Sequence, residues 1–161
     1  NECTSLKTIT IPVSVKFIGN IPFTIHAGEA DNANSVLDAI SFGAKRIGHG
    51  IRIIDDNDAI NKVIKNNVAL EVCPTSNFQT KAVEIYKNHP IKKLYKKGVL
   101  ITVSTDNNTV SNTTLSLEYE RLRSYFDFTD NDFLTFNINA INAAFISDLE
   151  KKKYIKILKG D

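Results

Sequence analysis

The stretch Ile21-Pro22-Phe23-Thr24-Ile25-His26-Ala27-Gly28-Glu29 decides the fold, because a short β-rich run ends in an imidazole and a carboxylate. Three later apolar runs end in the same manner. Their polar endings are Gly48-His49-Gly50, Cys73-Pro74-Thr75-Ser76-Asn77 and Ser104-Thr105-Asp106. A barrel of parallel strands carries its chemistry at the carboxyl ends of those strands. The repeated pattern therefore predicts a functional site where these four runs end.

Segments with helical spacing separate the four strand-like runs. This alternation is typical of repeated βα units, which build a parallel sheet, so the sequence predicts the α/β class. Four strands cannot close a barrel of eight, and the sheet is left with two open edges. We expect a missing half-barrel or a second chain to pair with these edges.

The connecting segments carry further signals. A polar connection over residues 75–90 has room to shape a pocket, and we expect His89 within it to lie at the surface. Thr129 and Asp132 have the spacing of a capping box and predict the start of a helix. A last helix is expected to start at Asp148. Its expected buried side chains are Tyr154, Ile155 and Leu158.

Composition and charge exclude several classes of protein. Of the 161 residues, 42% are hydrophobic, which suffices for a sizeable core, and no apolar stretch is long enough to span a bilayer. A formal net charge of +2 with scattered lysines indicates solvated faces and no nucleic-acid partner. Two distant cysteines, Cys3 and Cys73, make no disulfide scaffold, so we expect a soluble protein in the reducing cytoplasm. Because Asn1 replaces an initiator Met, we expect a fragment or a processed product.

Three polar residues at the strand ends are candidates for a metal site. His26 alone is more often structural than a ligand, whereas the glycines around His49 let the backbone approach a bound molecule. Asp106 ends an apolar strand, where a carboxylate needs a cation or a role as a helix N-cap, and clear helical spacing starts only near Thr113. Together the three make a ligand set that suits zinc with one open position. We interpret Cys73 as core packing and not as a nucleophile.

The four motifs, in this order and spacing, resemble the adenosine deaminase family from residue 21 to the C-terminus. The resemblance implies the C-terminal half of a (β/α)8 TIM-type barrel of the amidohydrolase kind over residues 21–161, with residues 1–20 as a poorly matching N-terminal segment. It also implies a zinc-dependent hydrolase of purine salvage. Its reaction would convert adenosine or deoxyadenosine to inosine or deoxyinosine and ammonia.

The resemblance assigns roles to individual residues. His26 and Asp106 would bind one zinc ion, and Asp106 would help to deprotonate its water. Glu29 would donate a proton to purine N1, which makes C6 easier to attack. His49 would orient the attacking hydroxide and stabilise the developing oxyanion. The substrate-binding residues would be Gly28 and Asn107.

Two departures from the family pattern limit what the resemblance implies. Asn107 stands where many members have a second Asp that bonds purine N7, and an Asn amide can donate there without first being protonated. The early His-x-His zinc ligands of the family are absent from this chain. We therefore expect the chain alone to bind zinc weakly and to turn over little, until an N-terminal half-barrel or a second chain completes it.

Three alternative functions remain on sequence grounds. Adenine deamination is one, and AMP deamination is a second, although four scattered arginines offer no obvious phosphate cluster. The third is an inactive, truncated fragment that binds purine nucleosides. Zinc content and turnover distinguish this last alternative from an enzyme.

Overall fold

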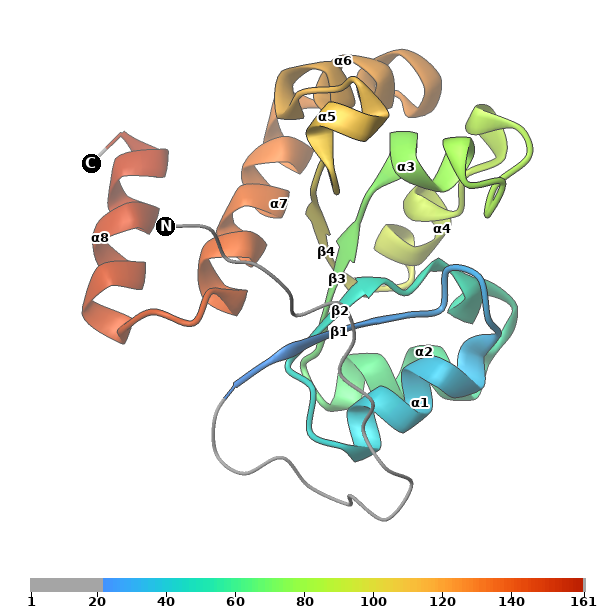
Figure 1. Ribbon diagram of the computed structural model, residues 1–161. Helices are drawn as coiled ribbons and strands as arrows, with labels where there is room; N and C mark the ends of the chain where they lie inside the picture. The colour runs from blue at the N-terminus through green and yellow to red at the C-terminus, as the bar shows by residue number, and fades with distance from the viewer. Residues whose placement is uncertain (1–21, 161) are drawn as a thin grey trace, which may run out of the picture.

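A computed structural model describes residues 22–160, which form a four-stranded parallel sheet flanked by helices (Figure 1). The strands lie in sequence order. They are β1 (Thr24–Ala27), β2 (Arg46–His49), β3 (Ala69–Val72) and β4 (Leu100–Val103). Within the described residues, β1 and β4 form the two edges of the sheet.

Helices follow every strand. They are α1 (Ala33–Ser41), α2 (Asn57–Lys65), α3 (Pro74–Gln79), α4 (Ile91–Lys96), α5 (Asn108–Ser111), α6 (Leu115–Phe126), α7 (Asp130–Ala143) and α8 (Asp148–Lys159). Short 3-10 turns cover Ile51–Asp55 and Tyr86–Asn88. Figure 1 shows α7 alongside β4 and α8 farther from the sheet, beyond α7.

The register of the sheet separates an apolar row from a polar row. One row across the four strands consists of Ile25, Ile47, Leu70 and Ile101, and its members pack in the main core. The next row, one residue further along, consists of His26, Gly48, Glu71 and Thr102. Successive side chains of a strand point to opposite faces, so the apolar row lies under the helices and the polar row faces the opposite side.

Helix α7 closes the core at β4. Its buried Phe133 and Phe136 pack with Phe128 and Tyr95, and the Phe136 and Tyr95 rings meet at 5.0 Å between centroids. The start of α7 has the predicted capping box, because the Thr129 hydroxyl accepts from the Asp132 N–H while the Asp132 carboxylate accepts from the Thr129 N–H. This prediction is confirmed.

The structure corrects two predictions about connecting segments. Residues 75–90 are not one long loop, since α3 follows β3 immediately, with Pro74 at a first-turn position where its missing N–H costs nothing. The last helix, α8, starts at Asp148 as predicted, but none of its side chains is buried. Tyr154 is 44% exposed and Leu158 is 37% exposed, because among the described elements α8 packs mainly against α7 and lies away from the sheet.

The α/β prediction is confirmed: residues 22–160 form a partial (β/α)-type barrel, in which parallel strands in sequence order alternate with helices. Predictions for residues 1–20 lie outside the described residues. No helix between residues 22 and 160 combines the length and apolar character that crossing a membrane requires.

We predict that Ile47→Ala lowers the free energy of unfolding by about 2 to 5 kcal/mol, because this side chain is fully buried in an interior strand. Ile157→Ala is the matched control, since Ile157 is 61% exposed on α8 and should change stability by less than about 0.5 kcal/mol. Urea unfolding of the purified chain measures both values. Equal losses in the two variants would contradict this position of the core.

Candidate active site

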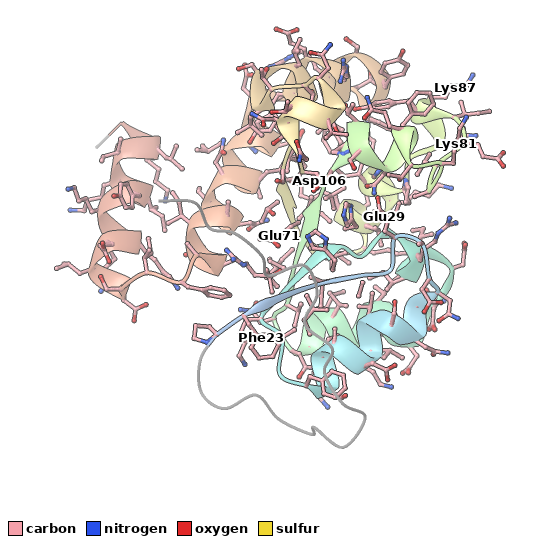
Figure 2. All side chains as sticks on the ribbon, in the orientation of Figure 1. Phe23, Glu29, Glu71, Lys81, Lys87 and Asp106 are labelled. Atoms are coloured by element: carbon pink, nitrogen blue, oxygen red, sulfur yellow. The ribbon has the colours of Figure 1, made fainter. Side chains whose placement is uncertain are left out.

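The carboxyl ends of the strands bring the predicted site residues together. His26 lies in β1, His49 ends β2, and Glu29 and Asp106 follow β1 and β4. Figure 2 shows Glu29 and Asp106 towards the middle of the molecule, whereas Lys81 and Lys87 lie at its periphery. The residues of one end of the sheet thus form one polar cluster, as the strand-end pattern predicts.

Asn77 connects two of the predicted catalytic residues. Its Nδ2 donates to Glu29 Oε1 at 3.0 Å and lies 2.9 Å from His49 Nδ1. Thr80 Oγ1 also donates to Glu29 Oε1 at 3.0 Å. The other carboxylate oxygen, Glu29 Oε2, lies 3.4 Å from His49 Nε2. Glu29 and His49 therefore hold each other in a fixed geometry through α3.

His89 is not at the surface, and the prediction that placed it there is wrong. Its side chain is buried, with the residue 3% exposed, and its Nε2 lies 3.2 Å from Asn77 Oδ1. The Ile91 N–H donates to the other ring nitrogen, His89 Nδ1, at 3.1 Å. The His-Pro pair thus turns inward at the start of α4 and reaches the site through Asn77. Sequence pattern alone offered only a histidine in a polar segment.

Asp106 is held at the end of β4 in a sparsely populated backbone conformation. Its φ is +58°, and Ser76 Oγ donates to its Oδ2 at 2.8 Å. Asp106 is not the N-cap of the next helix, because Asn107 has that role: Asn107 Oδ1 accepts from the Val110 N–H at 3.0 Å. Helix α5 also begins earlier than the helical spacing near Thr113 indicates. The Asp106 carboxylate is therefore not used as a helix cap and remains available to bind a ligand at the site.

His26 lies over a glycine, and this requires the absence of a side chain at position 48. A Cβ added to Gly48 would collide with the His26 ring. The ring meets His49 edge to face, with 5.1 Å between the centroids. His49 itself has a φ of +64°, which is a strained value for a non-glycine residue and typical of functional sites.

Gly28 shapes the site through its backbone. Its φ is +66°, and an added Cβ would lie 2.6 Å from a Val36 methyl carbon. Its N–H donates to Ser35 Oγ at 2.9 Å, and its carbonyl accepts from the Arg52 N–H at 3.0 Å. Both backbone groups are thus engaged within the protein. A direct contact of Gly28 with substrate stays a prediction.

A polar network below the site was missed by the sequence reasoning. Glu71 accepts from Thr24 Oγ1 at 2.7 Å and pairs with the Arg46 guanidinium, whose Nε lies 3.2 Å from Glu71 Oε1. The Arg46 guanidinium also stacks on the Phe145 ring, 4.0 Å from its centroid. Because Glu71 alternates with buried residues in β3, strand periodicity places it on the polar face, and that was the available signal.

A second missed residue, Glu118, holds the start of α3. It is fully buried in α6 and accepts from the Thr75 N–H at 3.2 Å and from Thr113 Oγ1 at 2.7 Å. Arg121 lies 3.7 Å away and compensates its charge. A buried carboxylate is costly unless it is paired and hydrogen-bonded, as it is here. Glu118 therefore fixes the segment that carries Ser76 and Asn77.

Burial controls the protonation of several groups near the site. Burial lowers the pKa of His49, and the neighbouring Glu29 carboxylate opposes this shift. Burial lowers the pKa of His89 to about 3, so its imidazole is neutral at physiological pH. Burial raises the pKa of the Cys73 thiol to about 12, which agrees with its interpretation as core packing.

The donor types available suit zinc but do not complete a site. His26 and Asp106 offer an imidazole nitrogen and a carboxylate oxygen, which are both common zinc ligands. Within residues 22–160, no group of three His, Cys, Asp or Glu side chains is arranged to hold a metal ion. His26 and Asp106 are thus two candidate ligands and do not form a metal centre by themselves.

The fold and the site define a partial (β/α) barrel whose polar groups converge at the carboxyl ends of its strands. The adenosine deaminase family profile matches residues 16–159, and the chain belongs to this family. An adenosine deaminase of Lacticaseibacillus casei is 46% identical over 132 residues, which are 82% of this chain and 39% of that protein. The chain thus spans about two fifths of the length of the curated relatives it matches.

Two solved structures have similar folds. An adenine deaminase from Arthrobacter aurescens superposes with a TM-score of 0.83 at 27% identity, covering 87% of this chain and 43% of that chain. An amidohydrolase from Burkholderia ambifaria with bound Zn superposes with a TM-score of 0.79 at 25% identity, covering 86% and 40%.

We predict that His89 makes stability depend on pH. Its pKa is about 3 in the folded chain and about 6.5 when unfolded, so only the unfolded chain binds its proton between these values. The free energy of unfolding should fall as the pH drops below about 6.5, with a slope from this group approaching about 1.4 kcal/mol per pH unit. His89→Gln removes this contribution. Chemical denaturation at several pH values should give a shallower decline for the variant, and parallel curves would contradict the assignment.

Proposed function

We propose that this chain supplies the carboxyl-terminal part of an active site for the hydrolytic deamination of adenosine or deoxyadenosine. The observation that carries the proposal is the Glu29, His49 and Asn77 cluster, with Glu29 Oε2 3.4 Å from His49 Nε2. Family membership and the identity to a named adenosine deaminase support the reaction. The products are inosine or deoxyinosine and ammonia. This reaction belongs to purine salvage.

Glu29 is the proposed proton donor to purine N1. One of its oxygens is held by Asn77 and Thr80, which leaves Oε2 as the oxygen to carry and deliver the proton. Protonation of N1 withdraws electrons from C6 and makes addition of a water-derived nucleophile easier. His49 orients this nucleophile and stabilises negative charge as it develops on the oxygen.

His26 and Asp106 are the residues that would hold zinc. A bound zinc ion supplies Lewis-acid activation of water at neutral pH. The amidohydrolase from Burkholderia ambifaria with bound Zn supports zinc as the metal. Asp106, held by Ser76, would accept a proton from the water molecule.

Asn107 is the proposed partner of purine N7. Because its Oδ1 accepts from the Val110 N–H as a helix cap, the Nδ2 group is the part that remains to donate to N7. An amide donates without titrating, so the contact would not depend on pH.

The open edges β1 and β4 are the basis of a proposed partner. Each pairs on one side only within the described residues, and unpaired edges bind further strands. We infer that an N-terminal half-barrel or a second chain completes the sheet and brings the remaining zinc ligands.

A reducing, cytoplasmic setting suits the free, buried thiol of Cys73.

Adenine deamination is the second candidate, because an adenine deaminase is among the similar solved structures. The higher identity to an adenosine deaminase favours the nucleoside. An assay with adenosine, deoxyadenosine, adenine and AMP in parallel distinguishes these substrates.

We predict that a chimera will deaminate adenosine when residues 22–160 replace the matching segment of the Lacticaseibacillus casei enzyme. Loss of absorbance from the 6-amino chromophore reports turnover. Glu29→Gln should lower kcat by about 100- to 10,000-fold, because it removes the proton donor. Glu84→Gln is the control, because it makes the same replacement at an exposed glutamate, and it should leave kcat unchanged. A folded chimera with zinc but without turnover would overturn the proposed function.

We predict that Asn107→Asp makes kcat/KM for adenosine fall more steeply with rising pH. The aspartate still caps α5 but must be protonated to donate to N7, so the variant should lose up to about tenfold per pH unit relative to its parent. Initial rates of the chimera at several pH values give the two profiles. Superimposable profiles would remove Asn107 from the proposed contact.

A further inference from the structure

We propose that His89, acting through Asn77, is a positioning residue that holds the neutral His49 ring with its proton on Nε2 and its lone pair on Nδ1. The proposal concerns the direction of hydrogen bonds along a buried chain that runs from the backbone at Ile91 to the His49 ring. Its functional consequence rests on the proposed deaminase function, whereas the hydrogen-bond direction itself does not.

The chain begins at a group whose role cannot change. The Ile91 backbone N–H is a donor only, and it points to His89 Nδ1 at 3.1 Å. His89 Nδ1 must therefore accept, and the single proton of the neutral ring must sit on Nε2. Burial lowers the pKa of His89 to about 3, which supports a neutral ring.

Asn77 carries this direction onwards. His89 Nε2–H faces an amide oxygen, Asn77 Oδ1, at 3.2 Å, because an amide NH2 in that place would set two donors against each other. The amide is fully buried, so no water can replace either partner without displacing packed atoms. The Asn77 NH2 group must then point to the other side.

Both protons of that NH2 group find acceptors. One is donated to Glu29 Oε1 at 3.0 Å, and the other points to His49 Nδ1 at 2.9 Å. His49 Nδ1 must therefore be the unprotonated nitrogen. The ring proton sits on Nε2, which faces Glu29 Oε2 at 3.4 Å.

This arrangement gives His49 one chemical role. A ring with its proton on Nε2 donates a hydrogen bond into the site and cannot accept one there. In the proposed reaction, His49 would thus stabilise negative charge on oxygen, while a carboxylate takes the water proton. The partner of a histidine sets which nitrogen is protonated, and here that partner is an amide fixed from behind by a second histidine.

The test is a direct reading of the ring nitrogens. The chain has three histidines, so a chain labelled with 15N-histidine gives three sets of ring signals in a long-range proton–nitrogen correlation spectrum. In the zinc-free chain at about pH 7.5, above the ordinary histidine pKa of about 6.5, His49 should show a protonated Nε2 and an unprotonated Nδ1. A His49 ring with its proton on Nδ1 would overturn the proposal.

Variants at Asn77 and His89 test whether these two residues set the tautomer of His49. Asn77→Asp has the same shape but only accepts, so it should move the His49 proton to Nδ1. His89→Leu removes the donor to Asn77 and should leave His49 with a mixture of the two forms. His89→Gln keeps an N–H where Nε2 lies and should restore the native form. If Asn77→Asp does not fold, the comparison of His89→Leu with His89→Gln decides the matter.

Lys87→Gln is the matched control in the same segment, because Lys87 is exposed and outside the chain of hydrogen bonds. Its spectrum should match that of the parent. Unchanged His49 signals in both Asn77→Asp and His89→Leu would show that neither residue sets the tautomer. This spectrum needs no substrate, so the proposal and the deaminase function can fail separately.

Discussion

The parallel register of the sheet is the constraint on which the rest of the structure depends. It aligns Ile25, Ile47 and their counterparts into one buried row, and it thereby aligns His26 with Gly48 and Glu71 in the next row. A slip of one residue would exchange the two faces, placing an imidazole and a carboxylate among the helices. The hydrophobic effect therefore positions the polar site, although none of the site residues contributes much apolar area.

Above the sheet, one buried amide organises the site. Asn77 is 0% exposed and meets a carboxylate and two histidines, and each of its polar atoms has a partner. Fully satisfied buried networks are rigid, whereas partly satisfied ones are costly. This rigidity helps to hold His49 in its positive-φ conformation, and Ser76 on the same helix holds the Asp106 side chain. The strain is local, and α3 and the buried Glu118 behind it provide the support.

The sequence was sufficient to predict the strands and the gathering of polar side chains at their carboxyl ends, because strand periodicity and strand-end polarity are local signals. His26, Glu29, His49 and Asp106 lie where these signals indicate. The burial of His89 and the exposure of α8 were predicted wrongly, since both depend on which distant element packs against them. Helical spacing in α8 says which residues share a face, but it does not say whether anything covers that face.

The two oxygens of Glu29 have different surroundings, because Asn77 and Thr80 both donate to Oε1 while Oε2 faces the His49 ring. A carboxylic acid in such surroundings is chemically asymmetric: one oxygen is the carbonyl and the other is the hydroxyl. In the proposed reaction, the proton would leave from Oε2, the oxygen that Asn77 and Thr80 do not hold. The two donors, Asn77 on α3 and Thr80 at its C-cap, thereby make the two oxygens distinct, as they would not be in a freely rotating carboxyl.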